Sequence, residues 1–176
     1  QIHHAWIGGL LEHSLQLMKL ADAMLPNYPR LNRDIILFSL FIHDMGKVEE
    51  LRWDRGFEYT REGNLIGHIA RGAMWLEDKA KIAEKNLGEP LPDGFLTVMQ
   101  HIVLSHHGLL EHGAVKLPAT PEAIFVSQLD NLDAHTQTAL DSARPWVQTA
   151  VGDEAFTERL WSLNTKLYRR DPLQTS

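Results

Sequence analysis

In the segment 35-IILFSLFIHDMG-46, the most apolar run of the chain ends in an imidazole and a carboxylate. Residues 35–42 are apolar nearly all round, which predicts a helix at the centre of a folded core. Gly46 suits a left-handed C-cap at the end of that helix. His43 and Asp44 would then lie where the most apolar helix of the chain ends.

Apolar residues at helical spacing continue on both sides of this segment, and Pro or Gly interrupts each pattern. Asn32 or Asp34 can cap the central helix. Residues 48–60 hold aromatic side chains around Asp54-Arg55-Gly56, which favours a small hairpin or extended loop. We expect an all-α bundle of about six helices, at residues 8–25, 32–42, 65–85, 94–107, 121–140 and 153–169.

The composition is that of a folded, water-soluble domain. Of 176 residues, 44% are hydrophobic and 23% are charged, close to globular averages, and we expect one domain over residues 1–176. No apolar run approaches the roughly 20 residues that span a bilayer, and no leader precedes residue 20. We therefore expect a cytoplasmic protein with no membrane partner. A motif begins at His3, close to Gln1, so we expect the natural chain to extend further in the N-terminal direction.

Charge and cysteine content narrow the chemistry. The formal net charge of −6 argues against a broad nucleic-acid-binding surface, so a polyanion would have to be held locally. The chain has no cysteine, which excludes disulfides, zinc–thiolate sites and thiol nucleophiles. His, Asp and Glu are left as the strong metal ligands.

Ten histidines are present, and several of them lie on the apolar face of an expected helix or at its end. Burying ionised groups without a counter-charge is strongly unfavourable, and a metal cluster removes that penalty. The candidate metal ligands come from five expected helices and are His13, His43, Asp44, His68, His106, His107 and Asp130.

This set is large enough for two divalent ions, with Asp44 as the bridge. The other ligands would form two shells: His13, His43 and Asp130 around one ion, and His68 with His106 or His107 around the other. Mixed imidazole and carboxylate donors suit Mn, Fe, Co, Ni or Zn, with Mg as a further alternative. Taken singly, each residue also has an ordinary interpretation as a core histidine, a helix cap or a buried hydrogen-bonding carboxylate. Their combination favours the metal site.

The remaining histidines are weaker candidates. His101 and His135 are expected to be core or supporting residues, and His112 a surface residue. His3 and His4 belong to the surface or to a substrate entrance. Core packing, an interface or base stacking would each account for the tryptophans Trp53, Trp75, Trp146 and Trp161.

The order His13, His43-Asp44, Asp130 on successive helices resembles the HD superfamily of metal-dependent phosphohydrolases. Six segments are similar to those of 3′-to-5′ exoribonucleases of the YhaM type: 3-HHAWIGGLLEHS-14, 43-HDMGKVEEL-51, 67-GHI-69, 105-SHHG-108, 118-PATPEA-123 and 130-DNLDA-134. The resemblance covers roughly residues 3–135 and extends weakly to Tyr168.

The resemblance implies an enzyme, commonly with manganese, that releases nucleoside monophosphates from the 3′ end of RNA and sometimes of DNA. Asp44, Lys47 and His107 are the expected catalytic residues. Lys47 is placed to reach a phosphate oxygen or the leaving group, and His107 is either a further ligand or the acid that protonates the leaving oxygen. Lys47 and Arg71 are the expected substrate-binding residues, although a solvated lysine and a salt-bridged arginine are their ordinary alternatives.

The sequence departs from the family pattern in two places. The N-terminal OB-type nucleic-acid-binding domain of the family is not among these 176 residues, which puts processive binding of long RNA in doubt for this chain. His135 stands where, in the family, Lys or Arg often follows the Leu-Asp-Ala run. This departure affects only a peripheral contact.

Two other functions fit the same residues. The site could hydrolyse nucleotides, dinucleotides or cyclic nucleotides, which the acidic net charge favours. Alternatively, the chain could be a non-catalytic nucleic-acid-binding or assembly module that keeps its metals for stability. Metal identity, RNA against DNA, and a homo-oligomeric state are left open.

Overall fold

The computed structural model describes residues 8–53, 56–145 and 155–173. The chain divides into two compact units, residues 1–130 and 131–176, and each is described by itself. The prediction of a single domain over all residues stays a prediction. No helix within the described residues is long and apolar enough to cross a membrane.

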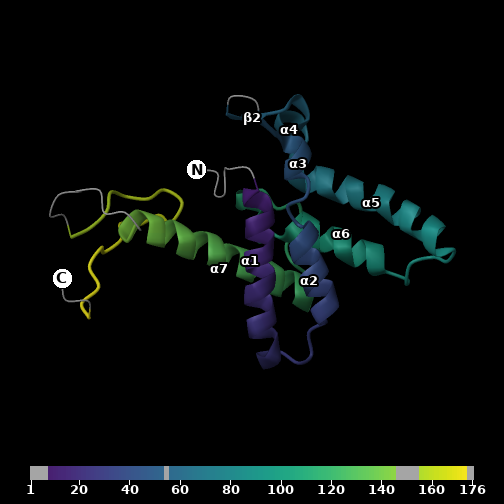
Figure 1. Cartoon of the computed structure of the whole chain (residues 1–176), viewed down its shortest axis with the longest axis horizontal. Coiled ribbons are helices and arrows are strands. Elements are labelled where there is room, and N and C mark those ends of the chain that lie inside the picture. The colour runs from purple at the N-terminus through teal and green to yellow at the C-terminus, as the bar shows by residue number, and fades with distance from the viewer. Residues whose placement is uncertain (1–7, 54–55, 146–154, 174–176) are drawn as a thin grey trace. The chain divides into compact units, whose positions relative to one another are not determined.

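Helices make up most of the first unit (Figure 1), which confirms the all-α prediction. The only strands among the described residues form one small hairpin. The elements are α1 (Gly9–Met24), η1 (Leu25–Asn27), α2 (Arg33–Ile42), α3 (Lys47–Glu50), β1 (Leu51–Trp53), β2 (Phe57–Tyr59), α4 (Arg61–Leu65), α5 (Gly67–Leu87), α6 (Phe95–Ser105), η2 (Leu110–His112) and α7 (Pro121–Ala143), the last of which runs on into the second unit.

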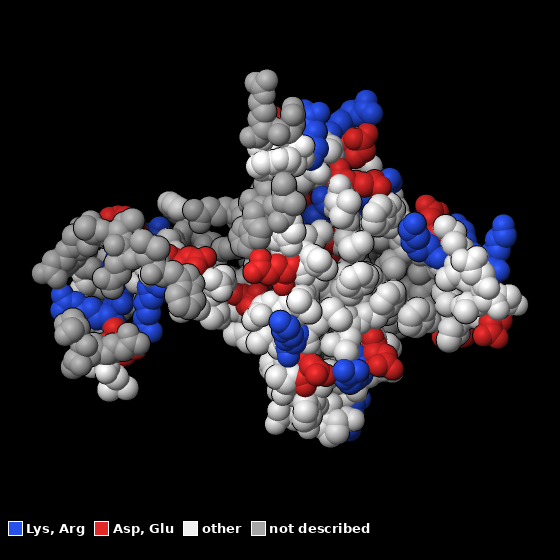
Figure 2. All heavy atoms as spheres, in the orientation of Figure 1, with Lys and Arg blue, Asp and Glu red and all other residues white. Residues whose placement is uncertain are grey.

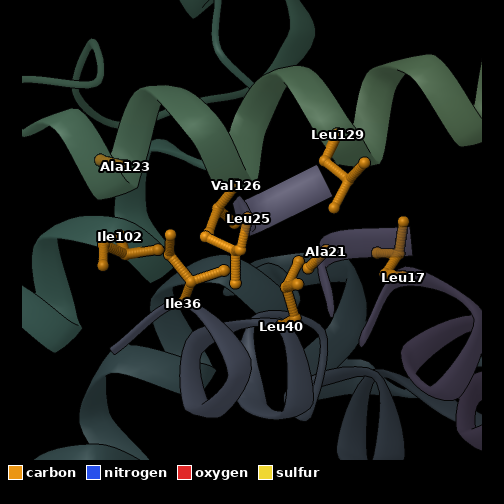
Figure 3. Close-up of a cluster of buried hydrophobic side chains, with 9 residues drawn as sticks. All are labelled: Leu17, Ala21, Leu25, Ile36, Leu40, Ile102, Ala123, Val126 and Leu129. Carbon is orange, nitrogen blue, oxygen red and sulfur yellow. The ribbon is translucent and has the colours of Figure 1, made fainter. Parts of the chain in front are cut away.

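The hydrophobic core of the first unit is shared by α1, α2, α6 and the first part of α7 (Figure 3). Ile36 and Leu40 of α2 are fully buried in it, which confirms the central position of that helix. Phe38 and Phe41 are exposed, however, so α2 is buried along a stripe and not all round. The core side chains are Leu17, Ala21, Leu25, Ile36, Leu40, Ile102, Ala123, Val126 and Leu129.

The beginning of α2 follows the prediction, and its end does not. The Asn32 side chain accepts hydrogen bonds from the backbone N–H groups of Asp34 and Ile35, as an N-cap does. Gly46 has φ −60° and is right-handed, so the predicted left-handed C-cap is wrong. Glycine is needed there because a Cβ would lie 2.0 Å from the backbone oxygen of His68. This close approach places the beginning of α3 against the beginning of α5.

The predicted hairpin after the His-Asp pair is confirmed. Strands β1 and β2 are antiparallel, with Arg52 opposite Glu58, and these side chains form an exposed ion pair at 2.8 Å. Thr60 ends the excursion by donating its hydroxyl to the Glu49 carbonyl and capping α4. The hairpin therefore begins directly after α3, and its other end is fixed by Thr60 to both α3 and α4.

In the second unit the predicted helix over residues 153–169 is wrong within the described part. Residues 155–170 form an irregular antiparallel hairpin, with isolated bridges that pair Phe156 with Tyr168 and Leu160 with Thr165. The apolar spacing resembles that of a helix, but Thr, Ser and Asn interrupt it, and their side chains compete for backbone hydrogen bonds. The N–H of Leu167, for example, donates to the Thr157 hydroxyl.

The contact at Gly46 gives the first prediction. Gly46→Ala puts a methyl group into backbone that cannot move without displacing α5, so we expect a loss of about 2–3 kcal/mol in unfolding free energy. Gly56→Ala is the matched control, since a Cβ there meets nothing within 4 Å. Urea denaturation measures both variants. Equal stability of the two would contradict the close-approach account.

Candidate metal centre

His43 is oriented by the helix that precedes it. Its ring Nδ1 lies 2.8 Å from the carbonyl oxygen of Leu40. A carbonyl only accepts, so Nδ1 carries the proton and Nε2 presents a lone pair. His43 is fully buried at the C-cap of α2, and this lone pair therefore faces the protein interior.

His106 and His107 are also oriented by carbonyl groups. His106 is the C-cap of α6, and its Nδ1 lies 2.7 Å from the carbonyl oxygen of Val103. The Nδ1 of His107 lies 2.8 Å from the carbonyl oxygen of His112. Each ring therefore offers Nε2 as an acceptor, which is the neutral form that binds metals.

His68 uses a carboxylate where the other rings use a carbonyl. Its Nδ1 lies 2.9 Å from Glu50 Oε2, and its backbone N–H donates to Glu50 Oε1 at 3.2 Å. Glu50 thus fixes both the ring and the beginning of α5. Glu50 was not among the predicted site residues, although it lies in the segment 43–51 that resembles the family.

Asp44 lies between two groups of imidazoles. Its Oδ1 is 3.5 Å from Nε2 of His68 and 3.6 Å from Nε2 of His106. Its Oδ2 is 3.5 Å from Nε2 of His43 and 3.9 Å from Nε2 of His13. One carboxylate oxygen therefore faces each group, which is the arrangement that a bridging ligand needs.

Asp130, on α7, lies beside His13 and His43. Its Oδ1 lies 3.2 Å from Nε2 of His13 and 3.9 Å from Nε2 of His43. The seven residues predicted as ligands thus come together from α1, the end of α2, α5, the end of α6 and α7. Their ligand atoms lie within 4.8 Å of one another in three groups: His68, His106 and His107; His13, His43 and Asp44; His43, His106 and Asp130.

Several lone pairs in this cluster are buried and unused. Unpaired buried polar atoms are unfavourable and rare in folded proteins. A divalent cation on each side of Asp44 would use these lone pairs, and imidazole and carboxylate donors suit first-row metals. Within the cluster, the buried atoms that have no hydrogen-bond partner among the described residues are His43 Nε2, Asp44 Oδ1, His68 Nε2 and His106 Nε2.

Burial keeps His43 and His107 neutral. It lowers the pKa of His43 from 6.5 to about 4, in spite of the negative charges of Asp44 and Asp130. Burial and the nearby His106 lower the pKa of His107 to about 4. These rings carry no proton on Nε2 at neutral pH and are ready to bind a cation.

The two carboxylates stay ionised although they are buried. Burial opposes ionisation of Asp44, but His43 and Lys47 hold the pKa of its carboxyl well below the ordinary range. Burial also opposes ionisation of Asp130, and the hydrogen bond from His13 outweighs it, lowering the pKa to about 2. The cluster is therefore anionic and attracts cations.

The two predicted phosphate-binding residues have different surroundings. Lys47 Nζ lies 2.5 Å from Asp44 Oδ2, and the neighbouring carboxylates raise its pKa although burial opposes the charge. Arg71 donates from Nε to the carboxylate of Glu49. Lys47 thus lies in the cluster, whereas Arg71 is a salt-bridged arginine in this structure.

The other histidines divide as follows. His101 is half-buried and accepts a hydrogen bond at Nε2 from the Ala119 backbone N–H at 2.9 Å, and its prediction as a core or supporting residue stays a prediction. His112 is exposed, as predicted. His135 is also exposed because it lies on the solvent side of α7, so its prediction as a core or supporting residue is wrong. The predictions for residues 3–4 and for Trp146 lie outside the described residues.

A protein-family model for the HD domain matches residues 10–135, which is most of the chain and spans all seven clustered side chains. The chain belongs to the HD domain family. The predicted resemblance is thereby confirmed.

Curated relatives give the same family relationship. The chain is 38% identical over 169 residues to a protein of Geobacillus sp. named 3'-5' exoribonuclease YhaM, covering 94% of this chain and 48% of the relative. Proteins of the same name from Bacillus pumilus and Bacillus subtilis are 37% and 35% identical, each over 94% of this chain and 49% of the relative. The chain therefore spans about half the length of the curated relatives that it matches. No solved structure matches it significantly.

The lowered pKa values predict acid instability of the metal-free protein. His43 and His107 take up protons near pH 6.5 when unfolded but only near pH 4 when folded. Between these values the unfolded state binds more protons, so the free energy of unfolding falls as pH falls, by about 1.4 kcal/mol per pH unit for each extra proton. Asp130 adds a further loss below pH 3.8.

Urea titrations in chelator at several pH values measure this dependence. His107→Gln removes one of the groups and should make the dependence on pH shallower. A free energy of unfolding that does not change from pH 6.5 to pH 4 would contradict the burial of neutral imidazoles.

Proposed function

We propose that this chain is the catalytic domain of a metal-dependent phosphodiester hydrolase, a 3′-to-5′ exoribonuclease that releases nucleoside monophosphates. The observation that carries the proposal is the set of buried, unpaired lone pairs on both sides of the Asp44 carboxylate. Membership of the HD domain family supports a hydrolase. The printed name of the relatives supports RNA as the substrate.

The ligand assignment is part of the proposal. Asp44 would bridge two divalent ions, with manganese as our first choice and Fe, Co, Ni, Zn or Mg as alternatives. The grouping of ligand atoms adds one feature to the sequence prediction, since His43 and His106 also lie in one group with Asp130. The proposed ligands are His13, His43, Asp44, His68, His106, His107 and Asp130.

Such ions, when bound, supply a nucleophilic water at neutral pH and neutralise charge on the phosphoryl oxygens. The protein provides position and charge. Glu50 and the carbonyl groups of Leu40 and Val103 hold three rings with Nε2 directed at the cluster. Lys47 holds a positive charge beside Asp44, where it can reach a phosphate oxygen or the leaving group.

His107 is better suited to be a ligand than an acid. Its Nδ1 proton is used in the hydrogen bond to the His112 carbonyl. Its pKa of about 4, set by burial and His106, leaves Nε2 without a proton at neutral pH. A leaving oxygen would therefore receive no proton from this ring at the start of the reaction, whereas a metal would find a free lone pair.

Asp44→Asn tests the bridging role. The amide keeps the shape of the side chain and loses the charge, so we expect a loss of at least one bound manganese and a fall of more than about 100-fold in the cleavage of a short RNA. Metal analysis and a single-turnover assay measure these two effects. His135→Ala is a control at an exposed position. Full metal content together with full cleavage by the Asn variant would rule out the proposed site.

Glu50→Gln tests the positioning of His68. The neutral amide holds the ring less firmly, so we expect manganese affinity to fall by about 10- to 100-fold. Isothermal titration calorimetry measures the affinity. Glu49→Gln is the matched control, because Glu49 pairs with Arg71 and contacts no predicted ligand through its carboxylate. Equal effects of the two substitutions would show that Glu50 has no special role.

A second candidate substrate is a small nucleotide, dinucleotide or cyclic nucleotide. It is favoured by the net charge of −6 and by the pairing of Arg71 with Glu49, which leaves less positive charge for a long polyanion. Product analysis separates the candidates. Stepwise release of mononucleotides from a 5′-labelled RNA supports the exoribonuclease, and turnover of small nucleotides alone supports the rival.

The cytoplasmic location that the sequence predicts stays a prediction.

A further inference from the structure

The C-terminal hairpin, residues 155–170, carries an aromatic side chain in an unusual position. Trp161 is 86% exposed, more than any other large aromatic side chain in the described part of the chain. Burial of an aromatic ring is strongly favourable, so a tryptophan kept in solvent on an ordered turn points to a binding role. None of the proposed metal ligands lies in this hairpin.

The turn that presents Trp161 is held by several interactions. The backbone N–H of Leu160 donates to the Thr165 carbonyl at 2.9 Å, and the N–H of Asn164 donates to the Trp161 carbonyl at 3.3 Å. Asn164 has φ 52°, the only positive φ of a non-glycine residue among those described. The side chain of Arg159 donates to the Asn164 amide oxygen and lies 5.6 Å from the Trp161 ring. The indole is therefore presented by a defined loop.

The charge of this hairpin is opposite to that of the whole chain. Residues 155–170 hold four basic side chains and one acidic side chain, a local net charge of +3, in a chain of net charge −6. Figure 2 shows Lys and Arg side chains over this C-terminal segment, which is yellow in Figure 1. The basic residues are Arg159, Lys166, Arg169 and Arg170, of which all but Arg169 are exposed.

The aromatic side chains and most of the basic ones are exposed, together with the polar Ser162, Asn164 and Thr165 and the acidic Glu158. Leu160, Leu163 and Leu167 are half-buried. Phe156 and Tyr168 form a tilted ring pair at 5.3 Å, and each is about half exposed. Protein interfaces are also enriched in Trp, Tyr and Arg, so it is the local net charge of +3 that favours a polyanion here. Aromatic faces interleaved with cations suit stacked bases and phosphates.

We propose that the hairpin 155–170 binds single-stranded RNA, with one base stacked on Trp161 and phosphates held by Arg159, Lys166 and Arg170. This inference rests on the proposed function only in taking RNA as the polymer. It gives the acidic chain a local site for a polyanion, remote in sequence from the metal ligands. Sequence-independent affinity follows, because every base has a face that can stack.

The test measures binding apart from cleavage. The full chain with Asp44→Asn is titrated into fluorescein-labelled oligo(U) of about 12 nucleotides, and anisotropy gives the affinity. Trp161→Ala in this background should weaken binding by about 10- to 100-fold, and Trp161→Phe should restore most of it. Trp53→Ala is the matched control, an exposed tryptophan on the other hairpin. Circular dichroism verifies that each variant is folded.

Charge is tested separately. Arg159→Gln with Lys166→Gln should weaken binding and lower the slope of log affinity against log salt by about 1 for each lost phosphate contact. In the chain with Asp44 intact, Trp161→Ala should raise KM for a long RNA more than KM for a dinucleotide.

Equal RNA affinity of Trp161→Ala and Trp53→Ala would overturn the proposal. So would a loss of self-association in sedimentation equilibrium, by Trp161→Ala, without a loss of RNA affinity, since the hairpin would then be a protein contact. If RNA binding depends on Trp161 but the metal-loaded chain cleaves no RNA, the hairpin proposal stands and the proposed function fails.

Discussion

Charge compensation around Asp44 is the constraint on which the rest of the structure depends. Asp44 is 3% exposed and His43 and His106 are almost fully buried beside it, with lone pairs that no hydrogen-bond donor in the described residues satisfies. Burying an ionised carboxylate and unpaired imidazole lone pairs is unfavourable unless a cation binds to them. Lys47 supplies one positive charge to Asp44. Asp44 Oδ1 and the Nε2 atoms of His43, His68 and His106 have no hydrogen-bond partner among the described residues, and we propose divalent cations as the other counter-charge.

The fold supplies this arrangement through the ends of its helices. His43 and His106 both lie at a helix C-cap and both donate Nδ1–H to the carbonyl three residues earlier. The same local geometry, used twice, turns Nε2 inward from two directions. Gly46 then lets the chain after α2 meet the backbone of His68, and Glu50 fixes that ring. The apolar core shared by α1, α2, α6 and α7 holds these helix ends in fixed positions relative to one another.

The sequence was sufficient for five of the six predicted helices and for the set of clustered residues, because both follow from local periodicity and from the order of His and Asp along the chain. It was insufficient where the cause is a contact between distant segments. The role of Gly46 depends on the backbone of His68, and Glu50 is found only through its contact with the same residue. The C-terminal hairpin was misread as a helix, because apolar spacing there does not reveal the backbone hydrogen bonds of Thr157 and Asn164.

Anomalous diffraction from crystals of the manganese-loaded protein tests the central claim most directly. The account predicts two peaks, one on each side of the Asp44 carboxylate, with Nε2 of His43 and Nε2 of His68 on different ions. Absence of any ion at Asp44, or ions bound only at surface carboxylates while the buried imidazoles stay unpaired, would contradict it.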